Sequence, residues 1–412
     1  MNDNNLKTMI VLVVNCGSSS LKYQLMDMKN DNVYDLLAKG LVERIGMDEG
    51  HLKHTPTGGE AYEMTCPIPD HTAGIKHVLD ALVDPAHGVL KSLEDIEAVG
   101  HRVLHGGDKL YRSTLITPEV VDQITICCDL GPLHNPANLM GIDAVTKNLP
   151  TVPQVAVFDT AFHQTMPDYN YIYGIPYEYY EKYRVRRYGF HGTSHKYVSQ
   201  RGAEFAGLDL NKSKIITCHL GNGSSIAAVE NGKCVMTSMG LTPLEGLLMG
   251  TRCGTIDPMV MCYLMDKEGL TSQQMNNIMN KKSGLLGISG VSSDCRDCGD
   301  AAASGNYRAK LALKKLSHDI IQTVGAYVAE MNGVDLIVFT GGIGENNGHM
   351  RRRVCDNLGY LGVKFDVEAN DCRGVERMIS TPDSKVKVAI IPTNEELMIA
   401  RDTMNIVNSL ND

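Results

Sequence analysis

Two stretches of the chain share one pattern, in which an apolar run leads into a glycine- and serine-rich turn and a second run follows. The first stretch spans residues 9–26 around the turn 17–20, and the second spans residues 214–236 around the turn 221–225. Each pattern predicts a strand, a tight turn and another strand. Because the N–H groups and hydroxyls of such turns can surround an anion, the sequence predicts a duplicated phosphate-binding architecture.

A third glycine-rich segment, residues 341–346, ends the apolar run 336–339 and is predicted to be a loop. Apolar residues at helical spacing between positions 308 and 332 predict a long helix that leads into that strand. Strand-like and helix-like segments alternate along the chain, which indicates an α/β protein.

Two further helix starts are predicted from capping residues. Thr193 or Ser194 is expected to cap a helix that runs to about residue 205. Thr393 or Asn394 is expected to cap a last helix whose first turn carries two carboxylates, where the helix dipole favours negative charge.

The length of the chain predicts two domains, because 412 residues exceed what a single hydrophobic core usually serves. Pro150, Pro153 and Pro167 interrupt the pattern around a buried-looking strand at 154–158. A domain boundary is therefore expected near residues 150–165.

The charge and the apolar runs exclude several classes of partner. A net charge of -9 argues against a general nucleic-acid binder, which needs a basic surface. The longest apolar runs are too short to span a membrane. Residues 1–8 are polar and precede a strand-like run, so no signal peptide is expected and a cytoplasmic location is predicted.

The 12 cysteines are scattered, and Cys295 and Cys298 form the only CxxC pair. Zinc usually takes four ligands, and no second pair stands nearby. Free thiols are therefore favoured over zinc or a disulfide framework.

Two arginines stand among glycines, Arg102 in the segment 100–107 and Arg252 in the segment 249–254. A guanidinium fork in such a setting suits a phosphate or a carboxylate. A surface or structural arginine is the alternative interpretation.

Four more side chains could contribute to an anion or metal site. Asp159 follows the apolar run 155–158, and a carboxylate at the end of a buried strand often faces a ligand crevice, although a turn aspartate is also common. His191 lies between glycines near two arginines, where it could stabilise an anion or be structural. Asn15, Asp159 and Glu395 carry oxygen donors that suit Mg²⁺ beside phosphates.

Common nucleotide motifs are missing from the sequence. It contains no GxxxxGK[ST] motif and no HRD or DFG motif, and the turn after the first strand does not supply GxGxxG. P-loop, dinucleotide-binding and protein-kinase interpretations therefore fail.

A series of segments resembles the acetate and propionate kinase family, within the actin, sugar-kinase and Hsp70 superfamily. The segments extend nearly from end to end in the family's order, at residues 14–22, 100–103, 157–163, 187–195, 219–223, 239–246, 339–346 and 392–396. The resemblance implies two α/β domains that share a βββαβαβα core, with a cleft between them. The first would comprise residues 1–160 with 396–412 returning to it, and the second, nucleotide-binding domain residues 161–395.

The resemblance also implies a homodimer that transfers a phosphoryl group between ATP and acetate, giving ADP and acetyl phosphate, with Mg²⁺ or Mn²⁺. Membranes and nucleic acids would not be partners. Direct transfer is expected rather than a phosphoenzyme. Acetate is already a carboxylate at neutral pH, so His191 is expected to stabilise the phosphoryl group and not to act as a base.

Roles for individual residues follow from the same resemblance. The catalytic set would be Asp159, Arg102, Arg252 and His191, and the metal ligands Asn15 and Glu395. Nucleotide and phosphate contacts would come from Ser18, Ser20, Lys22, His219, Leu220, Gly221, Asn222, Gly223, Asp294, Cys295, Arg296, Gly341, Gly342, Ile343, Gly344 and Glu345. Arg102 would bind the acetate carboxylate, and its methyl group would lie among Leu104, Leu133, Phe190 and Pro243.

Two positions depart from the family's pattern. Thr255 stands where many relatives carry Asp, close to Arg252, and Leu104 stands where valine is frequent. A larger side chain at 104 mildly favours acetate over propionate. A kinase for propionate or another short carboxylate, a pyrophosphate-linked acetate kinase, and an ATP-driven chaperone or filament former are the alternatives.

Overall fold

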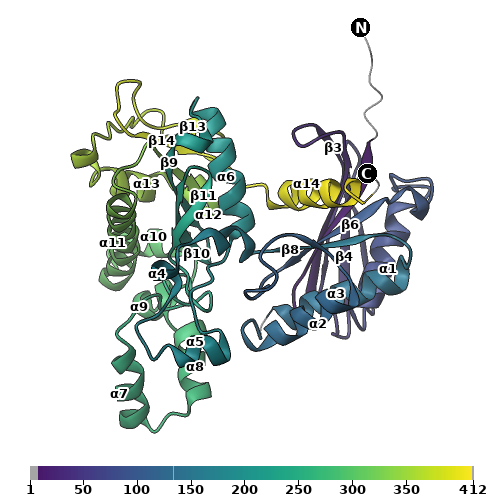
Figure 1. The fold of residues 1–412 in the computed structure, drawn as a ribbon, viewed down its shortest axis with the longest axis horizontal. Helices are drawn as coiled ribbons and strands as arrows, with labels where there is room; N and C mark the ends of the chain where they lie inside the picture. The colour runs from purple at the N-terminus through teal and green to yellow at the C-terminus, as the bar shows by residue number, and fades with distance from the viewer. Residues whose placement is uncertain (1–7, 133, 411–412) are drawn as a thin grey trace. The chain divides into compact units, whose positions relative to one another are not determined.

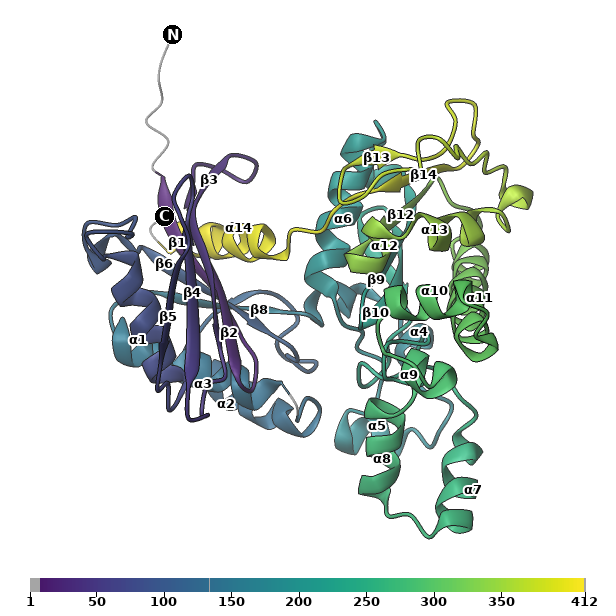
Figure 2. The same ribbon diagram turned by 180° about the vertical axis from the view of Figure 1, so that it is seen from behind.

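The computed structural model describes residues 8–132 and 134–410. The chain forms two compact units (Figures 1 and 2). The first contains Met1–Ala161 and Asn394–Asp412, and the second contains Phe162–Thr393.

The first unit is built on a mixed sheet in the order β5-β4-β3-β2-β1-β6-β8-β7. Its strands are β1 (Met9–Cys16), β2 (Ser20–Met28), β3 (Tyr34–Glu43), β4 (Gly50–Pro56), β5 (Tyr62–Cys66), β6 (Ala98–Val103), β7 (Thr114–Leu115) and β8 (Gln154–Phe158). Strand β1 pairs antiparallel with β2 and parallel with β6, which in turn pairs parallel with β8.

Helices cover both faces of this sheet (Figure 1). They are α1 (His71–Leu82), α2 (Pro118–Ile126), α3 (Asn135–Asn148) and the C-terminal α14 (Glu395–Asn408). Alternate residues of β1, such as Leu12 and Val14, join the core with α1 and α3. Helix α14 packs on β1, β6 and β8. It comes so close that a Cβ at Gly100 would lie 2.4 Å from Thr403 Oγ1 and 2.6 Å from Ile399 Cγ2, which explains the glycine there.

The second unit contains a sheet in the order β11-β10-β9-β12-β14-β13. Its strands are β9 (Lys214–Leu220), β10 (Ser224–Glu230), β11 (Lys233–Thr237), β12 (Leu336–Thr340), β13 (Arg377–Met378) and β14 (Lys387–Ile390). Strand β9 pairs antiparallel with β10 and parallel with β12, which pairs parallel with β14.

The helices of the second unit lie on both faces of its sheet (Figure 2). They are α4 (Asp168–Tyr171), α5 (Glu178–Tyr183), α6 (Gly192–Phe205), α7 (Pro258–Glu268), α8 (Ser272–Lys281), α9 (Gly284–Ser289), α10 (Cys295–Ala303), α11 (Tyr307–Glu330), α12 (Gly341–Asn346) and α13 (Gly348–Cys355). Strand residues alternate between the two faces of the sheet. Ile216 packs in the core cluster that contains Leu316 of α11, and Ile215 packs in the core cluster that contains Val198 of α6.

The central strands of the two units follow the same plan. The run β3-β2-β1-β6-β8 corresponds to β11-β10-β9-β12-β14 in order and direction. In both units the first two strands meet at one of the glycine-serine turns. The predicted duplication and the α/β class are confirmed.

Two local predictions are wrong. Residues 341–346 form the short helix α12 rather than a loop, because Gly341 takes a φ of +75° that turns the chain directly from β12 into a helix. Helix α6 starts at Gly192 with His191 as its N-cap, and neither Thr193 nor Ser194 caps it. Ser194 instead bonds side chains of β9 and of the segment before α14.

Other boundaries agree with the sequence. Asn394 caps α14, with its side chain accepting from Leu397 N, and the predicted long helix is α11. All 12 cysteines are free. Within the described residues, no helix is both long and apolar enough to cross a membrane.

Candidate active site

The first glycine-serine turn is held on both sides while its tip stays exposed. Gly17 N donates to Ser20 O at 2.8 Å, and His71 Nε2 lies 2.8 Å from Gly17 O. Asn138 Nδ2 donates to the carbonyl of Cys16 at 2.9 Å. Ser18 is exposed at the tip, so its hydroxyl and the neighbouring N–H groups are accessible to an anion.

Arg102 and Asp159 form a two-pronged ion pair at the ends of β6 and β8. Arg102 Nε donates to Oδ1 at 3.0 Å and Nη2 to Oδ2 at 2.7 Å. The Asp159 side chain is fully buried, whereas a quarter of the Arg102 side chain is exposed. The nearby carboxylate raises the pKa of Arg102, so the guanidinium stays charged. Because the pair occupies Nε and Nη2, it fixes the plane of the fork and leaves Nη1 for a ligand.

Glu395 opens α14 next to this pair. Burial raises the pKa of the Glu395 carboxyl to about 7. The positive charges of Arg102 and Lys22 lower this pKa, whereas the negative charges of Asp159 and Glu396 raise it. Glu395 Oε1 is buried and accepts no hydrogen bond from the described residues. An acceptor oxygen in this state favours a cation as its missing partner.

These oxygen donors fit a small divalent cation. Asn15 pairs with Lys22 across β1 and β2, and the charge of Lys22 acts on Glu395. Asn15 has an amide oxygen and Glu395 a carboxylate oxygen of the kind that Mg²⁺ binds. No group of three or more His, Cys, Asp or Glu side chains able to hold a metal occurs in the described part of the chain. Mg²⁺ commonly takes only one or two protein ligands and completes its shell with water and substrate phosphates.

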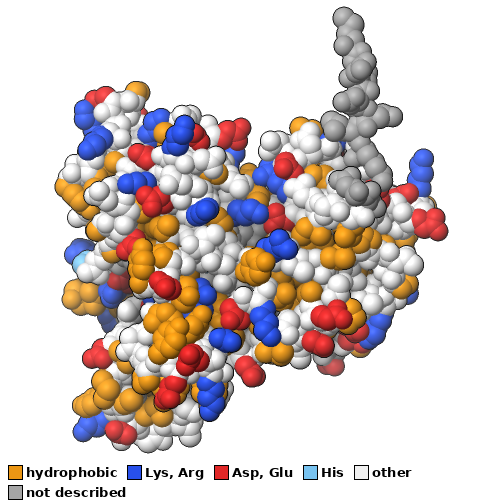
Figure 3. Space-filling model, in the orientation of Figure 1, with side chains coloured by type: hydrophobic (Ala, Val, Ile, Leu, Met, Phe, Trp, Pro, Cys, Tyr) orange, Lys and Arg blue, Asp and Glu red, His pale blue; other side chains and the backbone are white. Residues whose placement is uncertain are grey.

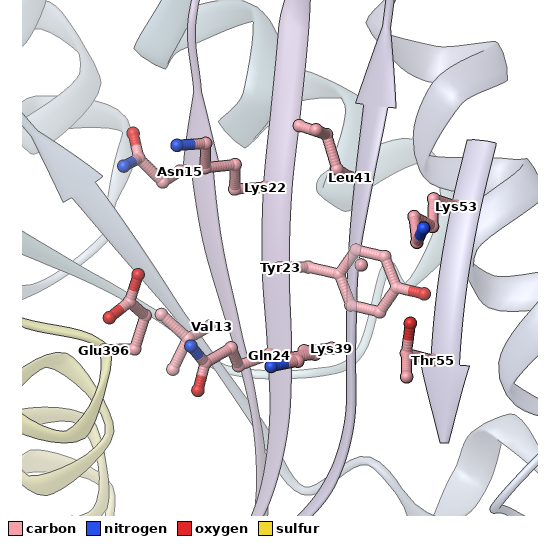
Figure 4. A pocket seen from close by; sticks show the side chains of 11 residues that line it. Val13, Asn15, Lys22, Tyr23, Gln24, Lys39, Leu41, Lys53, Thr55 and Glu396 are labelled. Carbon is pink, nitrogen blue, oxygen red and sulfur yellow. The ribbon is translucent and has the colours of Figure 1, made fainter. Parts of the chain in front are cut away.

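A pocket of about 250 Å³ opens on the sheet beside Asn15 (Figure 4). Figure 4 shows the Asn15 amide beside the Lys22 ammonium at one end, with Lys53 at the other. The full lining is Val13, Asn15, Lys22, Tyr23, Gln24, Lys39, Gly40, Leu41, Lys53, Thr55 and Glu396. Lys22, Lys39 and Lys53 therefore give this pocket a basic lining.

In the second unit His191 has an unusual backbone conformation. Its φ and ψ of 57° and 24° are left-handed, and Gly189 (φ +76°) and Gly192 flank it. A non-glycine residue in this region is strained, and such strain is concentrated at functional positions. The imidazole stacks on that of His219 with 4.3 Å between ring centroids. Ser225 Oγ lies 2.8 Å from His191 Nδ1, and Ser194 Oγ lies 2.8 Å from His219 Nδ1.

Arg252 carries a charge without a carboxylate partner in the described structure. Its Nη1 donates to the carbonyl of Pro243 at 2.9 Å, and burial lowers the pKa of the guanidinium. A Cβ built on Gly223 would lie 3.4 Å from both Arg252 Nη1 and His191 Nε2. A guanidinium nitrogen and an imidazole nitrogen thus lie near the same point of the second glycine-serine turn. Thr255 Oγ1 accepts a hydrogen bond from Gly246 N at 3.1 Å, which closes the loop that carries the arginine.

The remaining second-unit residues cluster around the end of β9. Gly341 packs so tightly against Leu220 that a Cβ would lie 2.7 Å from its carbonyl oxygen. Asn222 Oδ1 lies 3.4 Å from the Cβ position of Gly250, which also faces the carbonyl of Ser293. The turn 221–223, helix α12 and the start of α10 are therefore neighbours.

Three charged residues predicted to contact nucleotide are engaged within the protein. The Glu345 carboxylate accepts from Gly341 N at 2.9 Å and from Thr393 N at 3.2 Å, so it holds the start of its own helix. Asp294 caps α10 and pairs with Arg296 at 2.6 Å on the surface.

The residues predicted to contact the acyl group belong to different units. Leu104 is buried in the first unit, with its Cδ2 3.3 Å from the Cβ position of Gly131. Phe190 is buried and Pro243 half-buried in the second unit. Leu133 lies outside the described residues.

The sequence analysis missed the side chains that hold the two histidines. Ser194 and His195 lie in the same motif as His191, and Ser225 lies in the second glycine-serine turn. The signal was the spacing, since His191 and His195 are four residues apart at a helix start, where side chains share a face.

A duplicated α/β core with a glycine-serine turn in each copy, an arginine held by a buried aspartate in one unit and an arginine near the turn of the other, fits a phosphotransferase. The Acetokinase family matches residues 10–401. An acetate kinase of Thermoanaerobacterium thermosaccharolyticum is 58% identical over 403 residues, covering 98% of this chain and 100% of the relative. The chain belongs to the acetokinase family.

Solved structures agree with this assignment. The crystal structure of Porphyromonas gingivalis acetate kinase superposes with a TM-score of 0.92 at 51% identity, covering 97% of this chain and 100% of that one. A propionate kinase from Francisella tularensis superposes with a TM-score of 0.89 at 42% identity and the same coverage. The family, the two-sheet α/β fold and the expected activity, an acetate kinase with a carboxyl group as phosphoryl acceptor, are thereby confirmed.

Proposed function

We propose that the protein transfers the γ-phosphoryl group of ATP to acetate in one reversible, in-line step. The observation that carries this mechanism is the pair of donors at the second turn, Arg252 Nη1 and His191 Nε2, both 3.4 Å from the Cβ position of Gly223. Positive charge and donors aimed at one point suit the equatorial oxygens of a phosphoryl group in transfer.

In this step a carboxylate oxygen of acetate attacks the γ-phosphorus. The new O–P bond forms as the bond from phosphorus to the β–γ bridging oxygen breaks, and that oxygen leaves on ADP with the electron pair. Acetate is already ionised, so no proton needs to be removed. Arg102, oriented by Asp159, holds the carboxylate, while Arg252 and His191 stabilise the charge on the moving group.

Mg²⁺, or Mn²⁺ in its place, would be held by Asn15 and Glu395, and when bound it would neutralise the phosphate charge. The buried Oε1 of Glu395 that lacks a hydrogen-bond partner supports this assignment. Asp159 would act near the metal through its hold on Arg102.

For the nucleotide we propose contacts from both glycine-serine turns. Ser18, Ser20 and Lys22 would bind phosphate oxygens at the first turn, and His219 to Gly223 with Gly341 to Gly344 would do so at the second. Asp294, Cys295 and Arg296 would border the nucleoside at the start of α10. Glu345 would contribute through its backbone, because its carboxylate is engaged with Gly341 and Thr393.

Acetate is the proposed preferred acceptor, with the methyl group among Leu104, Phe190, Pro243 and Leu133. Propionate is the second candidate, because a propionate kinase shares the fold at 42% identity. One methylene in an apolar pocket changes binding by only about 1–3 kcal/mol, so the preference would be graded.

A homodimer and a cytoplasmic location complete the proposal. Large apolar side chains are exposed on the second unit around α5 and α7, namely Tyr169, Ile175, Tyr177, Tyr179, Tyr183, Met259, Val260 and Tyr263. Figure 3 shows apolar side chains, in orange, gathered over this part of the unit. An exposed patch of this kind often marks a protein interface. The free cysteines are compatible with a reducing compartment.

The experiment that tests the proposed function is a panel of formate, acetate, propionate and butyrate with MgATP, read as kcat/KM for acyl phosphate trapped as hydroxamate. We expect acetate to have the highest value, with propionate next. Pyrophosphate replaces ATP in a parallel series and should give no product. A higher value for propionate, or activity with pyrophosphate alone, would replace the proposal with one of the two alternatives.

A further inference from the structure

His191 is one end of a series of hydrogen-bonded side chains that continues into the core of the second unit. Its Nδ1 lies 2.8 Å from Ser225 Oγ, which lies 2.8 Å from His195 Nε2. On the other side of that ring, His195 Nδ1 lies 2.7 Å from Thr217 Oγ1. Ser225 (β10), His195 (α6) and Thr217 (β9) are all fully buried. The series therefore joins His191 to three different elements.

The central imidazole of this series is neutral. Burial lowers the pKa of His195 well below its ordinary value, and the neighbouring His163 and His219 act in the same direction. A neutral imidazole has one N–H and one lone pair, so it donates one of its two hydrogen bonds and accepts the other. The proton arrangement at Thr217 therefore determines the arrangement at Ser225.

The hydrogen bonds of Thr217 favour one of the two arrangements. Within the described chain, its hydroxyl makes a single hydrogen bond, the one to His195 Nδ1. If His195 donated that bond, the hydroxyl hydrogen would be buried without an acceptor, which native structures avoid. Thr217 therefore donates to Nδ1, and His195 Nε2–H donates to Ser225 Oγ. The Ser225 hydroxyl then donates to His191 Nδ1.

We propose that Thr217, His195 and Ser225 are positioning residues that keep the proton of His191 on Nε2, the nitrogen that faces the second glycine-serine turn beside Arg252. His191 can then donate a hydrogen bond to the phosphoryl group as a neutral ring, with no need to become an imidazolium. The stacked ring of His219, held through Ser194, fixes the plane in which Nε2 points. The inference rests on the proposed role of His191 in phosphoryl transfer.

The first test is direct observation of the tautomer. Long-range ¹H–¹⁵N spectra of protein labelled at histidine report which ring nitrogen is protonated, and the His191 signals are assigned by their loss in His191→Gln. We expect the Nε2–H tautomer in the wild-type protein. An Nδ1–H tautomer of neutral His191 would overturn the proposal, and this readout does not depend on any activity.

The second test removes hydroxyls that do not touch the substrate. Thr217→Val should erase the tautomer preference and lower kcat for acetyl phosphate formation roughly 10- to 100-fold, as when a partner that orients a histidine is removed. The KM values for ATP and acetate should change less than about twofold. Thr217→Ser keeps the hydroxyl and should restore most of the activity. The matched control is Thr237→Val, which removes an equally buried strand hydroxyl that donates to the carbonyl of Ile226.

Coupling between the variants separates a series from independent contacts. If Thr217 acts through Ser225, Thr217→Val combined with Ser225→Ala should be no slower than Ser225→Ala alone. If the losses of kcat in the two single variants multiply in the double variant, the proposal is overturned. It is also overturned if Thr217→Val and Thr237→Val have the same kcat and the same His191 tautomer. If Thr217→Val does not fold, the tautomer of His191 in the wild-type protein and the kcat of Ser225→Ala still test the proposal. Absence of acetyl phosphate formation by the wild type would refute the proposed function, while the spectra would still test the series.

Discussion

The two arginines of the candidate site are held by different kinds of partner. Arg102 shares two hydrogen bonds with the buried carboxylate of Asp159, which compensates its charge and fixes its orientation. Arg252 is held by the Pro243 carbonyl, and burial lowers its pKa. Because desolvation of Arg252 is not offset by a carboxylate, an anionic ligand would gain most from this guanidinium.

Arg252→Ala should therefore lower kcat about 10²- to 10³-fold, with little change in thermal stability. Arg252→Lys should recover only part of the loss, since a point charge cannot reproduce the guanidinium fork. Steady-state kinetics and melting curves measure both. The control is Arg308→Ala, which removes an arginine that donates to the carbonyls of Gly287 and Ile288. A kcat for Arg252→Ala close to that of the control would contradict the assignment.

Leu104→Ala tests the acyl pocket at the same scale. The change should raise kcat/KM for propionate relative to acetate by about 1–2 kcal/mol, because it opens room for one methylene. Leu110→Ala truncates another buried leucine of the same unit and should leave the ratio unchanged. An unchanged ratio with a lowered melting temperature would show Leu104 to be a core residue only, leaving the kinase assignment intact.

At the scale of elements, β6 carries a buried histidine, His101, next to Arg102. Burial lowers the pKa of His101 to about 4, although a hydrogen bond of 2.8 Å to Gln154 opposes the shift. In the unfolded chain the pKa of His101 is ~6.5, so between this pH and about 4 the unfolded chain binds a proton at His101 that the folded protein does not. The contribution of His101 to the free energy of unfolding is therefore fully present above the unfolded-state pKa and is lost as the pH falls towards about 4.

Between pH 7 and pH 5 the expected loss of stability attributable to His101 is about 2 kcal/mol. Denaturant unfolding of the wild-type protein and of His101→Gln at pH 7 and pH 5 measures it. The difference between the two pH values should be smaller in the variant. His318→Gln, at an exposed position of α11, is the control and should keep the wild-type difference. An equal difference in all three proteins would refute the account of His101.

The elements also show which features the sequence could predict. The strands on each side of both turns and the Asn394 cap follow from local periodicity and side-chain chemistry, and the structure has them. The start of α6 does not follow from local chemistry, because the Ser194 hydroxyl is hydrogen-bonded to His219 and Thr393, which are 25 and 199 residues away in the sequence. Local capping preference is outweighed there by tertiary hydrogen bonds.

The candidate site was predictable in residue types but not in geometry. Glycines and arginines in two segments indicated an anion site, and the resemblance supplied the order of the motifs. The pairing of Arg102 with Asp159 could not be predicted from composition, because the two residues are 57 positions apart and meet only through the pairing of β6 with β8. The series from His191 to Thr217 likewise depends on three elements that pack together.

For the whole molecule, the central prediction is that both glycine-serine turns serve one reaction. Adding ADP, Mg²⁺ and acetate should slow amide hydrogen exchange at residues 17–22 and at residues 219–224 in the same titration. Helix α8, which carries none of the proposed site residues, provides the internal control. Protection at only one turn would mean that the other does not bind the substrates.

The most direct test of the account is the stereochemistry at phosphorus. ATP made chiral at the γ-position with three oxygen isotopes is converted with acetate, and the configuration of the phosphoryl group in acetyl phosphate is determined. A single in-line transfer that uses Arg102, Arg252 and His191 predicts inversion. Retention would show two successive displacements through a phosphorylated residue and would contradict the account, as would the absence of acetyl phosphate.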